Sequence, residues 1–327
     1  MVLKIGNGSS RRNAENEEIG SIKSYLSLRY LRASAVENLT MPSKEQETAK
    51  MIELPEALTI ARQMNDELKG KKIESGNRGN SPHKFAFYNR EPEEYEEILA
   101  GKIVGEVKGD GNWISAPLEP GFKLVLGCMG GRILYHDFRN YQNEDTLPKK
   151  YHLMLCFEDQ TYLTVTIQMW GFIKLVEESE TVSFHTTLTP MSDEFTYGRF
   201  KQLLEDYEER DKKSIKYFMI SGPGILGIGN SYLQDILFRA KIHPKRLVAD
   251  IDGRESRGLY DAIRETMKEA IELGGRYDER DLYNNPGGYK RILDSKARGN
   301  PCPECGTPIE KIQYLGGASY FCPNCQL

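Results

Sequence analysis

Two Cys-x-x-Cys sequences close to the C-terminus constrain this chain more than any other feature. They are Cys302/Cys305 in CPECG and Cys322/Cys325 in CPNCQ, with sixteen residues between them. Each places two thiolates on one tight turn, and two such turns on a short hairpin close a tetrahedral four-cysteine site around zinc. Two disulfides are the alternative, but they would be unusual in a chain of 327 residues without an apolar secretory signal.

The composition is that of an ordinary globular protein with two or three domains. Hydrophobic residues make up 39% of the chain and charged residues 28%, and the formal net charge is −4. This balance gives no general sign of a polyanionic partner, so any surface that binds nucleic acid must be local. An apolar stretch of roughly twenty residues, long enough to span a bilayer, is absent from the sequence. We therefore expect a cytoplasmic protein without membrane contact.

Hydrophobic periodicity divides the chain into an α+β multidomain protein. A helix is predicted from Pro55, with apolar residues spaced between Leu54 and Leu68 and Gly70 ending it. Short β-branched or aromatic segments then favour an antiparallel β-sandwich. After Pro190 the period becomes helical, with Ser192 expected as an N-cap. The first fifty residues are polar and form either a disordered appendage or sequence upstream of a true start at Met51. The predicted divisions are 1–50, 51–187 (sandwich), 188–288 (helical) and 289–327 (zinc ribbon).

One glycine-rich segment in the helical part has the pattern of an anion-binding site. In the segment that runs from Gly222 to Pro244, a glycine-rich turn opens a helix whose first residues are Asn230, Ser231 and Tyr232. Free backbone N–H groups at a helix N-terminus, together with an asparagine side chain, can bind phosphate. Close helix packing is the alternative reason for such glycines.

Taken together, these motifs resemble one known family. The segment 222–244 is similar to the helix-two-turn-helix of the formamidopyrimidine-DNA glycosylase and endonuclease VIII family, and the ribbon is similar to that family's terminal zinc finger. The residues Met51-Ile52-Glu53-Leu54-Pro55-Glu56 resemble its opening Met-Pro-Glu-Leu-Pro-Glu. The resemblance extends from Met51 to Leu327 with the parts in the same order.

The resemblance implies a monomeric base excision repair protein that bends duplex DNA at a damaged base or abasic site and flips a nucleotide out of the stack. It implies zinc as the cofactor. Glu53 and Glu56 match the catalytic carboxylates. Gly229, Asn230 and Tyr232 match the phosphate-binding helix terminus, while Met129 and Trp170 match apolar wedge residues that hold DNA kinked.

Three positions depart from the family pattern. Ile52 stands where the family has a proline whose amine forms a Schiff base, and the nitrogen of Ile52 in this chain is a peptide amide that cannot attack. Asn112 and Gly317 stand where the family has a lysine and an arginine. Two hypotheses follow. The first is a DNA N-glycosylase, with or without lyase activity at abasic sites, that works through Glu53 and either a freed Ile52 amine or an unidentified lysine. The second is a non-catalytic protein that binds damaged or distorted DNA.

Overall fold

A computed structural model describes residues 52–127, 130–137, 147–180, 188–221 and 225–327. Within these ranges, residues 52–312 and 319–327 belong to one compact unit. The predicted appendage 1–50 and the candidate wedge Met129 lie outside the described residues. The helices in these ranges are all too short or too polar to cross a membrane.

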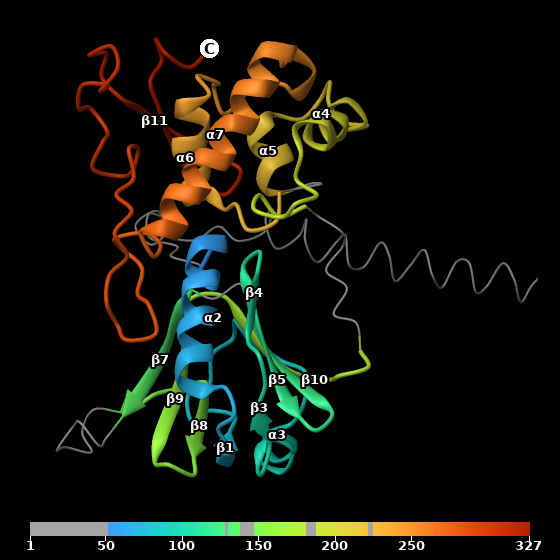
Figure 1. The fold of residues 1–327 in the computed structure, drawn as a ribbon. Helices are drawn as coiled ribbons and strands as arrows, with labels where there is room; N and C mark the ends of the chain where they lie inside the picture. Colours follow the sequence, from blue (N-terminus) through green and yellow to red (C-terminus); the bar gives the residue numbers. More distant parts are fainter. Residues whose placement is uncertain (1–51, 128–129, 138–146, 181–187, 222–224) are drawn as a thin grey trace, which may run out of the picture. The chain divides into compact units, whose positions relative to one another are not determined.

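The first half of the chain is a β-sandwich of two sheets (Figure 1). One sheet has the strand order β1-β8-β9-β7 and the other the order β2-β10-β6-β5-β3, with β4 paired to β5. The strands of the first sheet are β1 (Ile73–Asn77), β8 (Leu153–Phe157), β9 (Thr161–Ile167) and β7 (Gly131–Asp137). Those of the second are β2 (Ala86–Tyr88), β10 (Gly171–Glu177), β6 (Phe122–Gly127), β5 (Trp113–Glu119), β3 (Ile103–Val104) and β4 (Lys108–Asp110).

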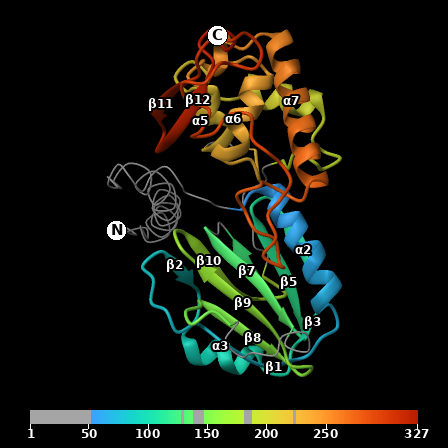
Figure 2. The same cartoon turned by 90° about the vertical axis from the view of Figure 1, so that its left-hand side faces the viewer.

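Alternating burial explains why these segments form strands with one face inward. In β8, Leu153, Leu155 and Phe157 are buried, whereas the two residues between them are half-buried. Helix α2 (Leu54–Leu68) adds Ile60 and Met64 to the same core, and Figure 2 shows it running alongside the strands. The short helix α3 (Pro92–Leu99) contributes buried residues at its inner face. Both sheets and α2 therefore share one hydrophobic core.

The predicted antiparallel sandwich is confirmed, with one exception at an edge. Strand β2 pairs with β10 in parallel, with Phe87 opposite Phe172, while the other strand pairs described in the two sandwich sheets are antiparallel. A parallel pair needs a long crossover. The segment between β2 and β10 supplies it, because most strands of both sheets lie within that segment.

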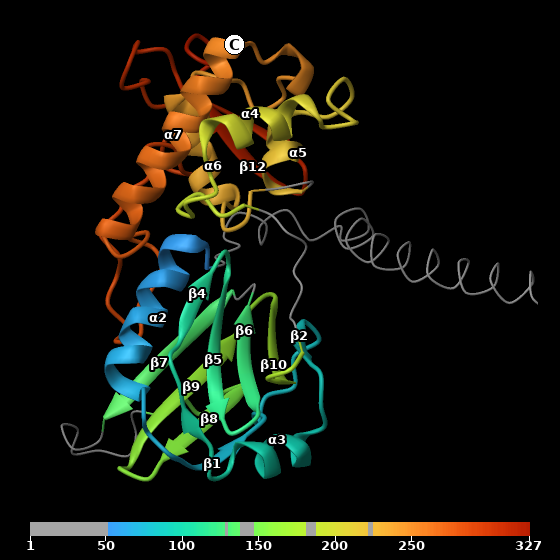
Figure 3. The same ribbon diagram turned by 45° about the vertical axis from the view of Figure 1, so that its right-hand side comes forward.

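In the second half, the described residues form four α-helices and a short 3₁₀ helix, followed by a hairpin (Figure 3). The helices are α4 (Tyr197–Glu205), α5 (Ile215–Ile220), α6 (Asn230–Arg239), η4 (Val248–Asp250) and α7 (Gly253–Glu272). Helix α4 starts later than predicted. Its N-cap is Thr196, whose side chain accepts from the Arg199 N–H, and not Ser192. The apolar faces of these helices meet in a second buried cluster. A hairpin of β11 (Glu310–Tyr314) and β12 (Gly317–Phe321) lies between the two cysteine pairs.

Candidate functional site

The segment Ile52-Glu53 enters the fold at the start of α2. Glu53 is the N-cap of α2, and Ile52 is only 5% exposed because its side chain joins the sandwich core. The Glu53 side chain is only 7% exposed. A buried carboxylate requires hydrogen-bond or charge partners, since an isolated buried ion is strongly disfavoured.

Two backbone amides at the start of α6 bind the Glu53 carboxylate. Gly229 N–H donates to Oε2 at 2.6 Å, and Ser231 N–H donates to Oε1 at 3.2 Å. The positive end of the helix dipole favours a negative group there. A Cβ at residue 229 would come within 2.6 Å of the Glu53 carboxyl carbon, so glycine at this position allows the close approach of the carboxylate. The helix terminus predicted to bind phosphate therefore already holds a carboxylate of the protein.

Arg276 is the cationic partner of Glu53. It follows Gly275 in the loop after α7, and its side chain is only 1% exposed. Its Nη1 donates to Glu53 Oε1 at 3.0 Å, and its Nη2 donates to Glu279 Oε1 at 3.0 Å. One guanidinium thus bridges two buried carboxylates that come from distant parts of the chain.

Glu56 connects three backbone segments around this pair. Its Oε1 accepts from the Tyr232 hydroxyl at 2.7 Å and from the Arg276 N–H at 2.9 Å, and its Oε2 accepts from the Glu53 N–H at 2.9 Å. Gly275 has a φ of 92°, and a Cβ there would lie 2.9 Å from Glu56 Oε1. The arrangement gives Glu56 a positioning role: it holds the backbone on both sides of the Glu53–Arg276 pair.

The cluster contains more acidic than basic groups. Glu53, Glu56, Asp278 and Glu279 all lie within 3.6 Å of Arg276, and Arg291 pairs with Asp278 at 2.9 Å. Burial raises the pKa of Glu53, and the Arg276 charge acts in the opposite direction. Burial raises the pKa of Glu279 to about 7, again against the Arg276 charge. The cluster can therefore take up or release a proton close to neutral pH.

The other predicted DNA contacts occupy different environments. Asn230 is the first residue of α6 and is half-buried, next to the Glu53 carboxylate. Tyr232 is fully buried and donates to Glu56, so it supports that carboxylate and presents no exposed group to a phosphate. Trp170 precedes β10, is partly exposed, and stacks on Phe85 with ring centroids 5.0 Å apart.

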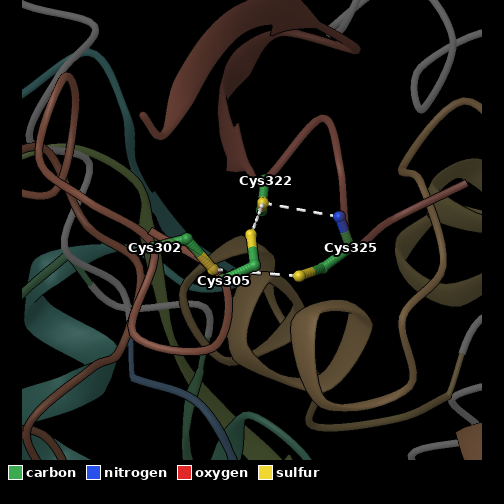
Figure 4. Close-up of side chains that lie close together, drawn as sticks. All are labelled: Cys302, Cys305, Cys322 and Cys325. Carbon is green, nitrogen blue, oxygen red and sulfur yellow. Dashed lines mark hydrogen bonds between the residues drawn. The ribbon is translucent and has the colours of Figure 1, made fainter. Parts of the chain in front are cut away.

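The four cysteines of the ribbon lie together (Figure 4). Their Sγ atoms are all within 4.8 Å of one another. The Sγ atoms of Cys302 and Cys325 are 3.9 Å apart, and those of Cys305 and Cys322 are 3.5 Å apart. Tetrahedral zinc with Zn–S bonds of about 2.3 Å requires S···S separations of about 3.8 Å, so this donor set fits the ion. These separations are too long for S–S bonds, which excludes the disulfide alternative for these residues.

Hydrogen bonds attach the ribbon to the helices. Gln326 donates through Nε2 to the Ile242 carbonyl at 3.0 Å and accepts from the Cys322 N–H at 2.9 Å. Lys216 of α5 is buried and donates to Ser319 Oγ at 2.8 Å, and burial lowers its pKa to about 8. The metal site thus fixes one end of the ribbon. Polar contacts attach the ribbon to α5 and to the residues that follow α6.

The sequence analysis missed Arg276. A signal was present: the arginine in Gly274-Gly275-Arg276 is followed, after Tyr277, by the acidic residues Asp278 and Glu279. Such a pattern also fits an exposed loop with solvated charges. Only the fold shows that this loop turns inward, where Arg276 meets the two glutamates of the 53–56 segment.

Comparisons with family models identify three regions of the chain. Residues 51–171 match the model described as the N-terminal domain of formamidopyrimidine-DNA glycosylase, and residues 187–279 match its H2TH domain. Residues 299–327 match the zinc finger found in FPG and IleRS. This match and the cysteine cluster together show a zinc-binding finger.

Curated relatives and solved structures cover nearly the same part of the chain. The formamidopyrimidine-DNA glycosylase of Solibacter usitatus is 31% identical, over 84% of this chain and 99% of the relative. That of Halalkalibacterium halodurans is 30% identical, over 84% of this chain and 100% of the relative. A complex of Lactococcus lactis Fpg with DNA containing an abasic site has 25% identity and a TM-score of 0.70, over 84% of this chain and 99% of that one.

Proposed function

Because this chain belongs to the formamidopyrimidine-DNA glycosylase family, we propose that it is a DNA-repair glycosylase. It binds duplex DNA that contains a damaged base or an abasic site and releases a damaged base after flipping it out of the helix. The observation that carries this proposal is the Glu53 carboxylate beside Ile52, held by the α6 amides and by Arg276. Relatives that carry the glycosylase name, and a related Fpg bound to abasic-site DNA, support it.

Glu53 is the residue to which we assign proton transfer. In hydrolytic base release, water supplies OH to the sugar C1′ while the bond from C1′ to the base nitrogen breaks. The departing base takes the proton. A carboxylate held at fixed geometry can accept the proton of the attacking water and return it to the leaving base. Arg276 and the amides of Gly229 and Ser231 fix that carboxylate, so they act as positioning groups.

Base release by this route needs no amine at position 52. The nitrogen of Ile52 follows Met51 in this sequence and is a peptide amide, which cannot form a Schiff base. We therefore propose hydrolytic excision without strand cleavage through a covalent intermediate. Borohydride treatment of the protein with an abasic-site duplex tests this point: we expect no covalent adduct, and a trapped adduct would show lyase chemistry at an amine.

The DNA contacts we propose come from several parts of the chain. Asn230 at the start of α6 and the zinc finger contact phosphates, and Trp170, together with Met129, acts as the wedge at the flipped nucleotide. Cys302, Cys305, Cys322 and Cys325 bind the zinc, which keeps the finger folded.

We retain 51–187, 188–288 and 289–327 as the domain boundaries, and expect a monomer. Its proposed substrate is chromosomal DNA, so we place the protein in the bacterial cytosol at the nucleoid.

The test of the proposal is base release by a variant that keeps the shape of the side chain. Duplexes with oxidised purines or pyrimidines are incubated with the full chain, and free base is measured by chromatography. Glu53→Gln should reduce the rate by about 100-fold or more, as expected when a general acid or base is lost. Glu106→Gln, at an exposed carboxylate in a surface ion pair, is the matched control.

Two results would overturn the assignment. Full activity of Glu53→Gln would show that another group transfers the proton. Tight and selective lesion binding by the unaltered protein with no base release from any substrate would support a protein that only binds damaged DNA.

A further inference from the structure

One segment of the sandwich combines basic and aromatic residues. Residues 75–90 contain no Asp or Glu, although the whole chain has a net charge of −4. They include the cations Arg78, Lys84 and Arg90 and the aromatic residues Phe85, Phe87 and Tyr88. Basic and aromatic residues interleaved in this way are typical of surfaces that bind single strands of nucleic acid.

The register of β2 separates these aromatic residues onto two faces. Ala86 and Tyr88 pack against the sandwich core. Because successive side chains of a strand point to opposite faces, Phe87 and its neighbour Phe85 lie on the outer face. Strand β2 is the edge strand of its sheet, so this outer face lies at the edge of the sheet.

Trp170 completes a group of rings on that outer face. Its ring stacks on Phe85 with centroids 5.0 Å apart and planes 17° apart, and its centroid is 5.4 Å from that of Phe87. Phe87 is 44% exposed. The Nζ of Lys84 lies 4.6 Å from the centroid of the Phe85 ring. We call Lys84, Phe85, Phe87 and Trp170 the aromatic surface.

The backbone on the Trp170 side of this surface is fixed by hydrogen bonds. Gly130 N–H donates to the Trp170 carbonyl at 2.8 Å, and Gln168 N–H donates to the Gly130 carbonyl at 2.6 Å. Gly171 N–H donates to the Phe85 carbonyl at 3.1 Å, which ties the two aromatic segments together. Rigid backbone contacts of this kind hold rings in place, so a ligand that stacks on them need not order them first.

We infer that the aromatic surface binds an unpaired nucleobase of a DNA strand, which stacks on its rings while Lys84 contacts the strand's phosphates. A base fits because every nucleobase has a flat π-face that stacks on aromatic side chains without regard to sequence. Arg78 and Arg90 are paired with Glu91 and Glu94. The exposed charge of Lys84 beside the rings favours a polyanionic strand over an apolar peptide. The inference rests on the proposed function in one respect: bent DNA with a flipped nucleotide supplies the unpaired base.

Tryptophan fluorescence gives a direct test with the full chain. The sequence has two tryptophans, so Trp113→Phe leaves Trp170 as the only one. This variant is titrated with oligothymidylate and with a deoxyribose-phosphate oligomer of equal length that carries no bases. Stacking predicts quenching by oligothymidylate alone. Equal effects of both oligomers would indicate phosphate contact only, and no effect of either would exclude the surface as a base-binding site, so both results overturn the inference.

A second test locates the unpaired base in the complex. The affinity of Phe87→Ala is measured for two duplexes with an abasic site, one with a base opposite the site and one without. Loss of one stacking partner should weaken binding to the first duplex by about fivefold or more, and should leave binding to the second unchanged. Tyr283→Ala is the control, because Tyr283 is 42% exposed and Phe87 44%.

The outcomes separate this inference from the proposed function. Equal affinity losses of Phe87→Ala for both duplexes, or no loss for either, would overturn the role of the aromatic surface even if base release is normal. Quenching by oligothymidylate together with no base release from any lesion would retain the aromatic surface and contradict the proposed enzyme activity.

Discussion

Arg276 Nη1 lies 3.0 Å from Glu53 Oε1, although the two residues are 223 positions apart in the chain. Both side chains are buried, and the same carboxylate also accepts the amides of Gly229 and Ser231. The contact therefore joins the start of α2, the start of α6 and the loop after α7. The Glu53 side chain therefore serves both the proposed chemistry and the assembly of these three segments.

Removal of Arg276 should destabilise the protein strongly. Arg276→Met leaves Glu53 and Glu279 buried without their cation, and breaking a buried pair by removing one partner costs about 3–5 kcal/mol. The free energy of unfolding in urea measures this loss. Arg257→Met is the control, because its ion pair with Asp261 is exposed and such pairs contribute about 1 kcal/mol or less. Similar losses in both variants would contradict the central role of Arg276.

The stability of the protein should fall between mildly acidic and neutral pH because of Glu279. Its pKa rises from the ordinary value of 4.5 to about 7, so the native state binds this proton more tightly than the unfolded chain does. The stabilisation is complete below pH 4.5 and is lost as pH rises through about 7. We expect Glu279→Gln to lose less unfolding free energy than the unaltered protein between pH 5 and pH 8, which urea titrations at about these two values would measure. Identical losses would place the proton elsewhere.

Zinc removal should unfold the ribbon and weaken DNA binding. Cys322 is buried and its Sγ lies 3.5 Å from that of Cys305, so Cys322→Ser removes one of four ligands. Metal analysis should show loss of bound zinc, and affinity for an abasic-site duplex should fall. Cys156→Ser, at a half-buried free cysteine of β8, should retain both properties. Full affinity without zinc would exclude a role for the finger in binding.

The phosphate contact assigned to Asn230 predicts a loss that does not depend on sequence. Asn230→Ala should weaken binding to damaged and intact duplexes by the same factor, because a phosphate contact positions the strand and does not read bases. Fluorescence anisotropy with several duplexes measures this. Gln202→Ala, at an exposed residue of α4, is the control. A loss confined to one lesion would place Asn230 at the flipped base.

Elements with strong periodicity could be predicted from the sequence. Helix α2 spans Leu54–Leu68, within two residues of the helix predicted from Pro55 with Gly70 ending it, and α6 begins at Asn230 as its glycine-rich turn predicts. The four cysteines meet because their spacing fixes two tight turns. In these cases local chemistry alone decides the structure.

Features that depend on tertiary contacts could not be predicted. Ser192 and Thr196 are both good N-caps, and only packing of α4 selects Thr196. The parallel pairing of β2 with β10 depends on a crossover that no local pattern encodes. The residues next to Arg276 in the sequence fit an exposed loop with solvated charges equally well. The amides of Gly229 and Ser231 were predicted to bind an external anion, whereas the fold brings them an internal one.

Glu53 has both a proposed role in proton transfer and a structural role, and this affects how lineages of this protein diverge. A descendant that no longer excised bases would still be selected to keep the glutamate, since losing it would remove two hydrogen bonds between the start of α2 and the start of α6. Retention of Glu53 among descendants would therefore indicate that the fold is intact. Phe87 is exposed and does not hold these segments together. Substitution of Phe87 would therefore be an earlier sign that a lineage no longer binds nucleic acid.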